Sequence, residues 1–295
     1  MITGGSSGIG FAIAKRFLLE GVDRIILVGR SHERLVRAAT QLEPPVLKAS
    51  GSTRSTDAAN DNNVASRAPE EDQAQDQSEI SPGTLIKSSD RIGLLVGDIS
   101  EASAWTKALE NAMQPVDILI NAAGISTSNA LPRTDPKEIS QVLRTNLEGS
   151  ILSCRALVRA SIRNQMKSRA GDTTSPTPSK CIINISSLLA LKGGTGAVPY
   201  AASKAGILGL TRSLTVEASK TLRNQVIRSN AIVPGYIETP MIAGFSQAEN
   251  NKLKEEIPLR RFGQPHEVAD AAVFLAQNEY ANNCVINLDG GLSAL

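Results

Sequence analysis

Tyr200 and Lys204 carry the strongest chemical signal in this sequence of 295 residues. Residues at positions i and i+4 share one face of a helix, so the ammonium of Lys204 can lie close to the phenol of Tyr200. A free tyrosine has a pKa of about 10, and a neighbouring cation lowers that pKa toward the neutral range. The pair therefore predicts a phenol that gives a proton to a bound substrate, with Lys204 as its activator.

Ser187 strengthens this interpretation because it directly follows a short apolar run at 181–186. At the end of a strand, its hydroxyl could hold a substrate carbonyl oxygen beside the phenol of Tyr200. A tyrosine and a lysine at this spacing occur by chance in many helices, so the pair has weight only together with the other motifs. Found together and in this order along the chain, the motifs predict hydride addition to a carbonyl carbon while Tyr200 protonates the oxygen.

A glycine-rich turn precedes the first amphipathic helix, in the sequence TGGSSGIG at 3–10. Glycines allow the backbone to approach a pyrophosphate, whose charge is then stabilised by amides at the helix N-terminus. A glycine-rich turn alone is a weak signal. We expect cofactor contacts from Thr3, Gly4, Ser6, Ser7, Gly8, Ile9 and Gly10.

The type of cofactor is indicated by Arg30 and Ser31, which follow the apolar run at 24–29. An acidic residue here would bind a ribose 2′-hydroxyl, whereas a basic residue accommodates a 2′-phosphate. Arg34 lies one helical turn further on, which favours NADP(H). The alternative is that both arginines are merely solvated charges at a helix start.

Strand and helix patterns alternate along the chain, which predicts an α/β fold. Nearly continuous apolar runs, typical of strands buried on both faces of a parallel sheet, occur at 24–29, 92–97, 116–121, 181–186 and 226–233. Helical patterns occur at 31–42, 101–113, 136–167, 199–222 and 265–277. We predict a single Rossmann-like domain over 1–295, a doubly wound parallel sheet with helices on both faces.

Two polar stretches interrupt this pattern. Residues 43–90 contain few branched apolar or aromatic residues and predict a disordered insertion, and 168–179 predicts a loop insertion. The net charge of +2 gives no argument for nucleic-acid binding, and no apolar run approaches the roughly 18 residues that span a bilayer. The three cysteines fit neither a disulfide framework nor a zinc site, and we expect no metal. We expect a soluble protein of a reducing compartment, mitochondrial or cytoplasmic.

Together these motifs resemble the short-chain dehydrogenase/reductase family over nearly the whole chain outside the insertions. The resemblance implies four catalytic residues: Asn146, Ser187, Tyr200 and Lys204. Asn146 would hold a water in a proton relay to the lysine. The resemblance also implies further cofactor contacts, from Asp98 and Ile99 at the adenine, from the N-A-A-G turn Asn121, Ala122, Ala123 and Gly124, and from Pro234, Gly235, Ile237 and Thr239 near the nicotinamide.

Within the family, the sequence IPLRRFGQP at 257–265 resembles the 3-oxoacyl-[acyl-carrier-protein] reductases and related tetrameric carbonyl reductases. This implies reduction of a 3-oxoacyl thioester in fatty acid biosynthesis and a homotetramer. The alternative is a carbonyl, quinone or secondary-metabolite ketone reductase. An acyl-carrier protein is acidic, and a basic helix stripe could bind it, formed by Arg155, Arg159, Arg163 and Lys167, with Lys220 and Arg223 nearby. The other explanation of the stripe is a solvated helix face.

The sequence departs from the family at two places. Only Met1 and Ile2 precede Thr3, so the first strand is expected to be truncated and to leave neighbouring backbone groups unpaired. Asn282 and Asn283 stand where relatives have a Thr-Gly turn. The truncated strand and the long acidic insertion leave a catalytically inactive cofactor-binding or interaction protein as the alternative from another class, although an inactive protein has no chemical need of all four catalytic residues.

Overall fold

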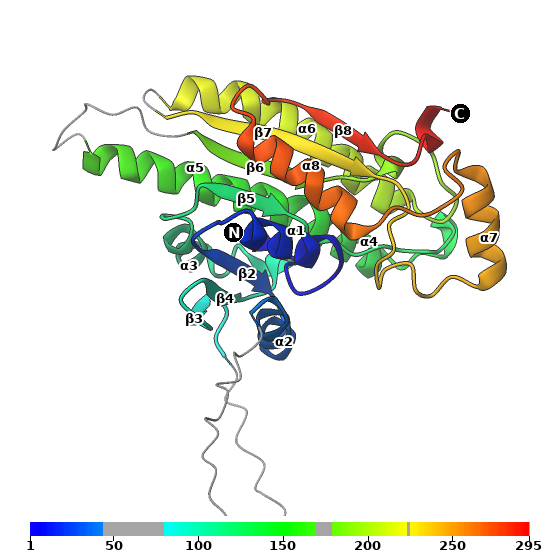
Figure 1. Ribbon diagram of the computed structural model, residues 1–295, viewed down its shortest axis with the longest axis horizontal. Helices are drawn as coiled ribbons and strands as arrows, with labels where there is room; N and C mark the ends of the chain where they lie inside the picture. Colours follow the sequence, from blue (N-terminus) through cyan, green and yellow to red (C-terminus); the bar gives the residue numbers. More distant parts are fainter. Residues whose placement is uncertain (44–79, 169–178, 223–224, 295) are drawn as a thin grey trace, which may run out of the picture.

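The computed structural model describes residues 1–43, 80–168, 179–222 and 225–294. Within these ranges, eight strands form one sheet in the order β3-β4-β2-β1-β5-β6-β7-β8 (Figure 1). Neighbouring strands pair in parallel, except that β3 is antiparallel to β4. The strand order reverses between β1 and β5, which is where ligands bind in open α/β sheets. The predicted doubly wound, Rossmann-like single domain is confirmed.

The elements alternate as the sequence predicts. The strands are β1 (Ile2–Thr3), β2 (Ile25–Gly29), β3 (Thr84–Lys87), β4 (Ile92–Val96), β5 (Ile118–Asn121), β6 (Lys180–Ile185), β7 (Ile227–Pro234) and β8 (Val285–Leu288). The α-helices are α1 (Gly8–Leu19), α2 (His32–Leu42), α3 (Thr106–Ala112), α4 (Pro136–Leu143), α5 (Gly149–Ser168), α6 (Val198–Thr221), α7 (Gln247–Glu256) and α8 (Pro265–Gln277). Short helical turns are η1 (Ile99–Glu101), η2 (Leu131–Arg133), η4 (Leu188–Ala190) and η5 (Leu292–Ala294), and η3 (Arg144–Glu148) is a π-helix.

Two apolar cores lie on opposite faces of the sheet. Helices α1, α2 and α8 cover one face, and their buried side chains include Phe17, Leu35 and Val268. Helices α3, α5 and α6 cover the other face, with Leu109 and Leu157 among the buried side chains. The central strands β2 and β4 are apolar because both of their faces are removed from water. None of the helices in the described ranges is both long and apolar enough to cross a bilayer.

The first strand has only two residues, as predicted, and lies between β2 and β5. Ile2 pairs with Leu27 on one side and with Ile120 on the other. Met1 extends the pairing, because its carbonyl accepts from Ile120 N at 2.9 Å and its amino group donates to Ile118 O at 2.7 Å. Burial lowers the pKa of that amino group to about 5. The backbone groups expected to be unpaired on this stretch of β5 therefore have partners.

The structure differs from the sequence-based prediction in several segments, and parts of both predicted insertions lie outside the described residues. The prediction of disorder over 43–90 is wrong for 80–90, because these residues contain β3; residues 44–79 lie outside the described residues. Of the predicted loop insertion 168–179, residues 169–178 also lie outside them. The predicted helix 136–167 is divided by the π-turn η3, and α7 was not predicted.

Candidate active site

Helix α6 places Tyr200 and Lys204 on the same side, one turn apart. The Nζ of Lys204 lies 5.8 Å from the centre of the Tyr200 ring. It donates to the carbonyl oxygen of Ile185, the last residue of β6, at 2.8 Å. Lys204 is 4% exposed, so this hydrogen bond fixes a buried ammonium at the end of the sheet.

Burial controls the pKa of both groups. It lowers the pKa of Lys204 to about 8, because a desolvated ammonium is less stable than a neutral amine. It raises the pKa of Tyr200, and a hydrogen bond with the Ser187 hydroxyl partly opposes this. Desolvation is the largest effect, so the net shift of the Tyr200 pKa is upward, opposite to the direction expected from the sequence. At neutral pH, Tyr200 is a protonated phenol, which is the form that donates a proton.

Ser187 lies between β6 and the short turn η4. It caps that turn, and its Oγ accepts from Leu189 N at 3.3 Å. The backbone of Ser187 is extended, and its hydroxyl forms a hydrogen bond with Tyr200. The phenol and the hydroxyl therefore form a pair that could hold one carbonyl oxygen.

Asn146 lies in the π-turn η3 and is fully buried. Its Nδ2 donates to Ile125 O at 2.9 Å and to Ser203 Oγ at 3.0 Å, and its Oδ1 accepts from Ile125 N at 2.9 Å. Its backbone carbonyl accepts from Ser150 Oγ at 2.8 Å. The side-chain N–H groups therefore hold the loop after β5 against α6 and are not free for a substrate.

The glycine turn and the N-A-A-G turn are in contact. Thr3 Oγ1 accepts from the amides of Ala122 and Ala123, each at 3.2 Å. Gly4 has φ +67°, and a Cβ added there would lie 2.8 Å from the backbone of Ala123. A side chain at position 4 is therefore excluded both by its conformation and by lack of space. Gly4 is therefore needed for the close packing of the glycine turn against the N-A-A-G turn.

A second turn of the predicted cofactor site lies at the start of α2. Ser31 caps this helix and accepts from Arg34 N at 3.3 Å. The Arg30 guanidinium is 3.7 Å from a carboxylate oxygen of Asp98, and Arg34 Nη2 donates to Ser7 Oγ at 3.4 Å. Two exposed or half-exposed arginines thus lie beside the glycine turn, where a 2′-phosphate could be bound.

Other predicted contact residues have structural roles as well. Asp98 caps η1, because its carboxylate accepts from Ser100 N at 2.9 Å. The Ile99 side chain is buried in the core with α3 and α5, so contact with a cofactor would fall to its backbone. Ile237 is also buried, and a Cβ added at Gly8 would lie 3.4 Å from Thr239. Thr239 therefore closes over the glycine turn from the other side of the cleft.

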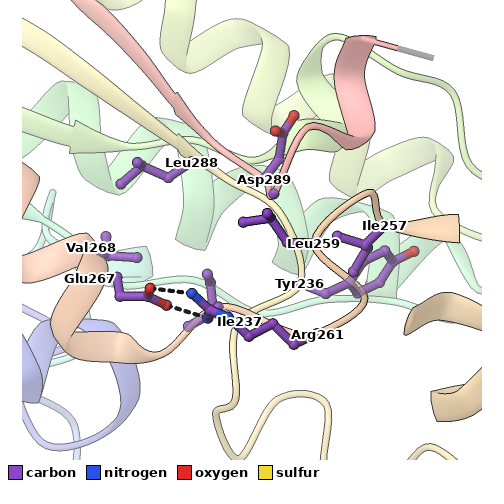
Figure 2. Close-up of a pocket in the computed structure, with 11 residues that line it drawn as sticks. Tyr236, Ile237, Ile257, Leu259, Arg261, Glu267, Val268, Leu288 and Asp289 are labelled. Carbon is purple, nitrogen blue, oxygen red and sulfur yellow. Dashed lines mark hydrogen bonds and ion pairs between the residues drawn. The ribbon is translucent and has the colours of Figure 1, made fainter. Parts of the chain in front are cut away.

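The loop after β7 is supported from behind. Pro234 ends β7, and the amide of Gly235 donates to Leu288 O in β8 at 2.8 Å. A cavity of about 120 Å³ is lined by Tyr236 and Ile237 of this loop and by Arg261 and Glu267. The Arg261 guanidinium donates to the Glu267 carboxylate at 2.8 and 2.6 Å (Figure 2). This pair lowers the pKa of Glu267 to about 2. The cavity holds none of the four predicted catalytic residues and belongs to the loop's support.

A larger, more open cavity of about 540 Å³ lies in front of the same loop. Thr239, a predicted cofactor contact, is in its wall, together with Ile242, Lys254 and Phe262. Lys254 Nζ lies 5.0 Å from the centre of the Phe262 ring. Asn250 and Lys254 of α7 line it on one side, so this cavity lies between α7 and the segment 238–243.

Sequence reasoning did not identify two hydroxyls that touch the catalytic helix. Ser186 Oγ donates to Lys204 O at 2.8 Å, and Ser203 Oγ donates to Tyr200 O at 2.6 Å. Both residues are buried. Ser203 stands inside the YAASK sequence, but only its hydrogen-bond partners in the fold distinguish it from any other helix residue.

Comparisons with known proteins agree with this geometry. The profile of a family described as "short chain dehydrogenase" matches residues 1–75, and one described as "Enoyl-(Acyl carrier protein) reductase" matches 72–293. A 3-oxoacyl-[acyl-carrier-protein] reductase of Chlamydia muridarum is 32% identical over 99% of this chain and 96% of its own length. Carbonyl reductase family member 4 of Danio rerio is 39% identical over 67% of this chain and 76% of its own.

Solved structures show the same fold. A 3-oxoacyl-[acyl-carrier protein] reductase of Brucella melitensis superposes with a TM-score of 0.73 at 25% identity, covering 99% of this chain and 90% of that one. A gluconate 5-dehydrogenase of Beutenbergia cavernae, with bound NADP, gives 0.74 at 23% identity and covers 100% and 96%. With both profiles and a full-length relative in agreement, the chain belongs to the short-chain dehydrogenase/reductase family of oxidoreductases.

Proposed function

We propose that this protein reduces the ketone of a 3-oxoacyl thioester with NADPH, as the 3-oxoacyl-[acyl-carrier-protein] reductases among its relatives are named for doing. The observation that carries the proposal is the grouping of the partly exposed Ser187 and Tyr200 with the buried Lys204 at the carboxyl end of β6. The full-length similarity to the Chlamydia muridarum reductase supports the substrate class.

The residues of this chain would hold the cofactor along the cleft. The amides at the N-terminus of α1, which follow the glycine turn, would hold the pyrophosphate, and Arg30 and Arg34 would bind a 2′-phosphate. Thr239 and the N-A-A-G turn would border the nicotinamide end. When bound, NADPH supplies the hydride.

Proton transfer falls to Tyr200. Ser187 and Tyr200 would both donate hydrogen bonds to the substrate carbonyl oxygen, which polarises the carbonyl and orients it. Negative charge develops on that oxygen as hydride adds to the carbon, and Tyr200 gives it the phenolic proton. The Lys204 ammonium stabilises the phenolate that remains, since 5.8 Å to the ring centre is within electrostatic reach in a dry site.

An acidic carrier protein remains the proposed partner, but the basic stripe is less free than the sequence suggests. Arg155, Arg159 and Arg163 all form ion pairs with the buried carboxylate of Glu110 on α3. Each arginine is still more than a third exposed, so the cluster keeps an excess of positive charge. Lys220, at the end of α6, is exposed. Arg223 and the Lys167 side chain lie outside the described residues.

A homotetramer is also proposed, on the resemblance to tetrameric relatives. Apolar side chains on the outer surface of α4, α5 and α6 support it, because Leu143, Ile151 and Val216 are 37%, 42% and 53% exposed. Sedimentation of the purified protein tests this, and a monomer at micromolar concentration would contradict it.

The test of function follows NADPH absorbance with three carbonyls: an acetoacetyl thioester on acyl-carrier protein, the same acyl group on a short thiol, and a simple quinone. We expect the highest kcat/KM with the carrier-bound substrate, and a loss of at least 10³-fold in kcat for Tyr200→Phe with unchanged NADPH binding. Quinone as the best substrate would favour the carbonyl reductase alternative, which the similarity to the Danio rerio protein supports. NADPH binding without oxidation by any carbonyl would overturn the proposal in favour of an inactive binding protein.

A further inference from the structure

Ser203 is a fully buried hydroxyl between Tyr200 and Lys204 on α6. Its Oγ donates to the backbone carbonyl of Tyr200 at 2.6 Å and accepts from Asn146 Nδ2 at 3.0 Å. The hydroxyl therefore joins the helix that carries the phenol to the π-turn that carries Asn146.

The carboxamide of Asn146 has only one orientation compatible with its partners. The amide of Ile125 can only donate and its carbonyl can only accept, so Oδ1 faces the first and Nδ2 faces the second. The second hydrogen of Nδ2 is directed at Ser203 Oγ. Without that hydroxyl, a buried N–H would lose its partner, which favours rearrangement of the carboxamide.

Such a rearrangement would reach the reacting groups. Ile125 follows Gly124, and a Cβ placed on Gly124 would lie 3.4 Å from both Lys204 Nζ and Asn146 Oδ1. The loop held by Asn146 is thus the wall beside the ammonium. It is also the last part of the N-A-A-G turn, which borders the predicted nicotinamide side of the cleft.

We propose that Ser203 is a positioning residue, whose hydroxyl fixes the Asn146 carboxamide and through it the placement of the 124–125 loop beside Tyr200 and Lys204. The kinetic part of this inference rests on the proposed reductase function. Ser203 touches no reacting atom, so its loss should reduce the rate of the chemical step more than the binding of NADPH or substrate.

Ser153 provides a matched control. It is also a fully buried serine in a helix, and its Oγ donates to Gly149 O at 2.8 Å, but its hydroxyl is bonded within α5 alone. Ser203→Ala and Ser153→Ala therefore remove the same atom from equally buried sites. Ser203→Thr keeps the hydroxyl and serves as the rescue variant.

Steady-state kinetics at a temperature where all variants are folded give the first readout. For Ser203→Ala we expect kcat to fall at least 10-fold, with KM and the Kd of NADPH within twofold of the parent. Ser153→Ala should keep kcat within twofold even if its Tm falls, and Ser203→Thr should recover most of the lost kcat. Equal kcat values for the two alanine variants would overturn the positioning role. If Ser203→Ala does not fold, Ser203→Cys takes its place, because it keeps the volume with a weaker donor.

A second readout does not depend on any substrate. The chain has three tyrosines, so Tyr236→Phe/Tyr280→Phe leaves Tyr200 as the single phenol whose ionisation changes the tyrosinate absorbance. The groups that face this phenol are the Lys204 ammonium and the Ser187 hydroxyl. In this background, Ser203→Ala should move the titration midpoint toward the value of about 10 of a free phenol, because water gains access to the site. Ser153→Ala should leave it unchanged.

The two readouts separate the two proposals. If the parent protein reduces no carbonyl, the proposed function fails and the titration alone decides the role of Ser203. A midpoint that is the same in the parent, Ser203→Ala and Ser153→Ala would overturn the inference, whatever the enzyme's substrate.

Discussion

Arg34 at the start of α2 donates a hydrogen bond at 3.4 Å to the Oγ of Ser7, the residue that directly precedes α1. The contact joins the N-termini of two helices that both border the glycine turn. A helix N-terminus stabilises negative charge, so two of them and a guanidinium meet where a dinucleotide's phosphates are expected. By contrast, the Arg30 guanidinium already faces the Asp98 carboxylate. Arg34 is therefore expected to contribute more than Arg30 to binding a 2′-phosphate.

Replacing Arg34 should change the cofactor preference. We expect Arg34→Ala to raise the Kd of NADPH by roughly 10- to 100-fold and that of NADH by less than twofold, because a charge-assisted hydrogen bond contributes about 1.5–3 kcal/mol. Arg30→Ala should have a smaller effect. Arg37→Ala is the control, since Arg37 lies one turn further along α2 and pairs with Glu33. Fluorescence titration of the parent and the three variants with both cofactors measures the dissociation constants, and equal weakening of NADPH and NADH binding by Arg34→Ala would contradict a 2′-phosphate site.

The buried ammonium of Lys204 should make the active site a source of instability. Since burial lowers its pKa to about 8, the folded state binds fewer protons than the unfolded chain between that pH and about 10.5. The contribution of Lys204 to the free energy of unfolding should therefore rise with pH across that window and be lowest below pH 8. Lys204→Met, which removes the charge and keeps the length, should abolish reduction and raise the free energy of unfolding at pH 7 by about 1–3 kcal/mol. Urea unfolding measures this difference, with Lys15→Met at an exposed position as the control. A destabilised Lys204→Met protein would show that the hydrogen bond of the ammonium outweighs its desolvation.

The pKa of Tyr200 and that of Lys204 determine how the rate of reduction responds to increasing pH. Reduction needs Tyr200 as a phenol and Lys204 as an ammonium. Burial raises the pKa of the first and lowers that of the second to about 8, so Lys204 loses its proton first as the pH increases. We expect kcat for carbonyl reduction to be level below pH 8 and to fall about tenfold per pH unit above it. A profile that stays level until about pH 10 would show that the bound cofactor restores the ordinary lysine pKa.

The relative positions of Tyr200 and Lys204 in the candidate site could be predicted from the sequence because they depend on local geometry. The spacing of Tyr200 and Lys204 requires only a helix, and the turn at 3–10 requires only its glycines and the helix that follows. The direction of the Tyr200 pKa could not be predicted, since it depends on how completely the surrounding chain removes water. The role of Ser203 was missed for a related reason: its partner Asn146 lies 57 residues away in sequence.

The same distinction explains the errors in the fold. The strand β3 has the sequence TLIK, with two apolar residues and partly exposed side chains, so its pattern is too short to be recognised. It forms because its backbone pairs with β4, a contact that no local signal encodes. Helix α7 has no buried residue, and its N-terminus is specified by a capping box between Ser246 and Glu249 rather than by an apolar face.

The arginine cluster on α5 should depend on Glu110 for stability. Glu110 is buried at 2% exposure, and its carboxylate pairs with Arg155, Arg159 and Arg163. Glu110→Gln leaves three like charges facing one amide, and we expect it to lower the free energy of unfolding by about 1–3 kcal/mol. Salt should reduce the difference because the arginines are partly exposed. Urea unfolding at two ionic strengths tests this against the exposed Glu101→Gln, and equal stability of the two variants would mean that the arginines are fully solvated charges.

The departure at Asn282 and Asn283 is accommodated by the special conformation of the second asparagine. Asn283 has φ +60°, a left-handed conformation that asparagine tolerates better than other non-glycine residues. Its amide donates to Ser229 O at 2.9 Å, and Asn282 Oδ1 accepts from Ser229 N at 2.9 Å. The turn therefore still aligns β8 with β7, although relatives are expected to place glycine here.

A substitution series at Asn283 isolates this backbone effect, because the side chain is exposed. Glycine should match or slightly exceed asparagine in thermal stability, since it adopts positive φ without strain but loses more entropy on folding. Alanine should cost about 1 kcal/mol, and valine about 1–3 kcal/mol, because a β-branched side chain clashes with the backbone in this region. Thermal unfolding of the four proteins gives the order. If valine were as stable as glycine, Asn283 would not be held at positive φ, and the pairing of β8 with β7 would have to rest on Asn282 alone.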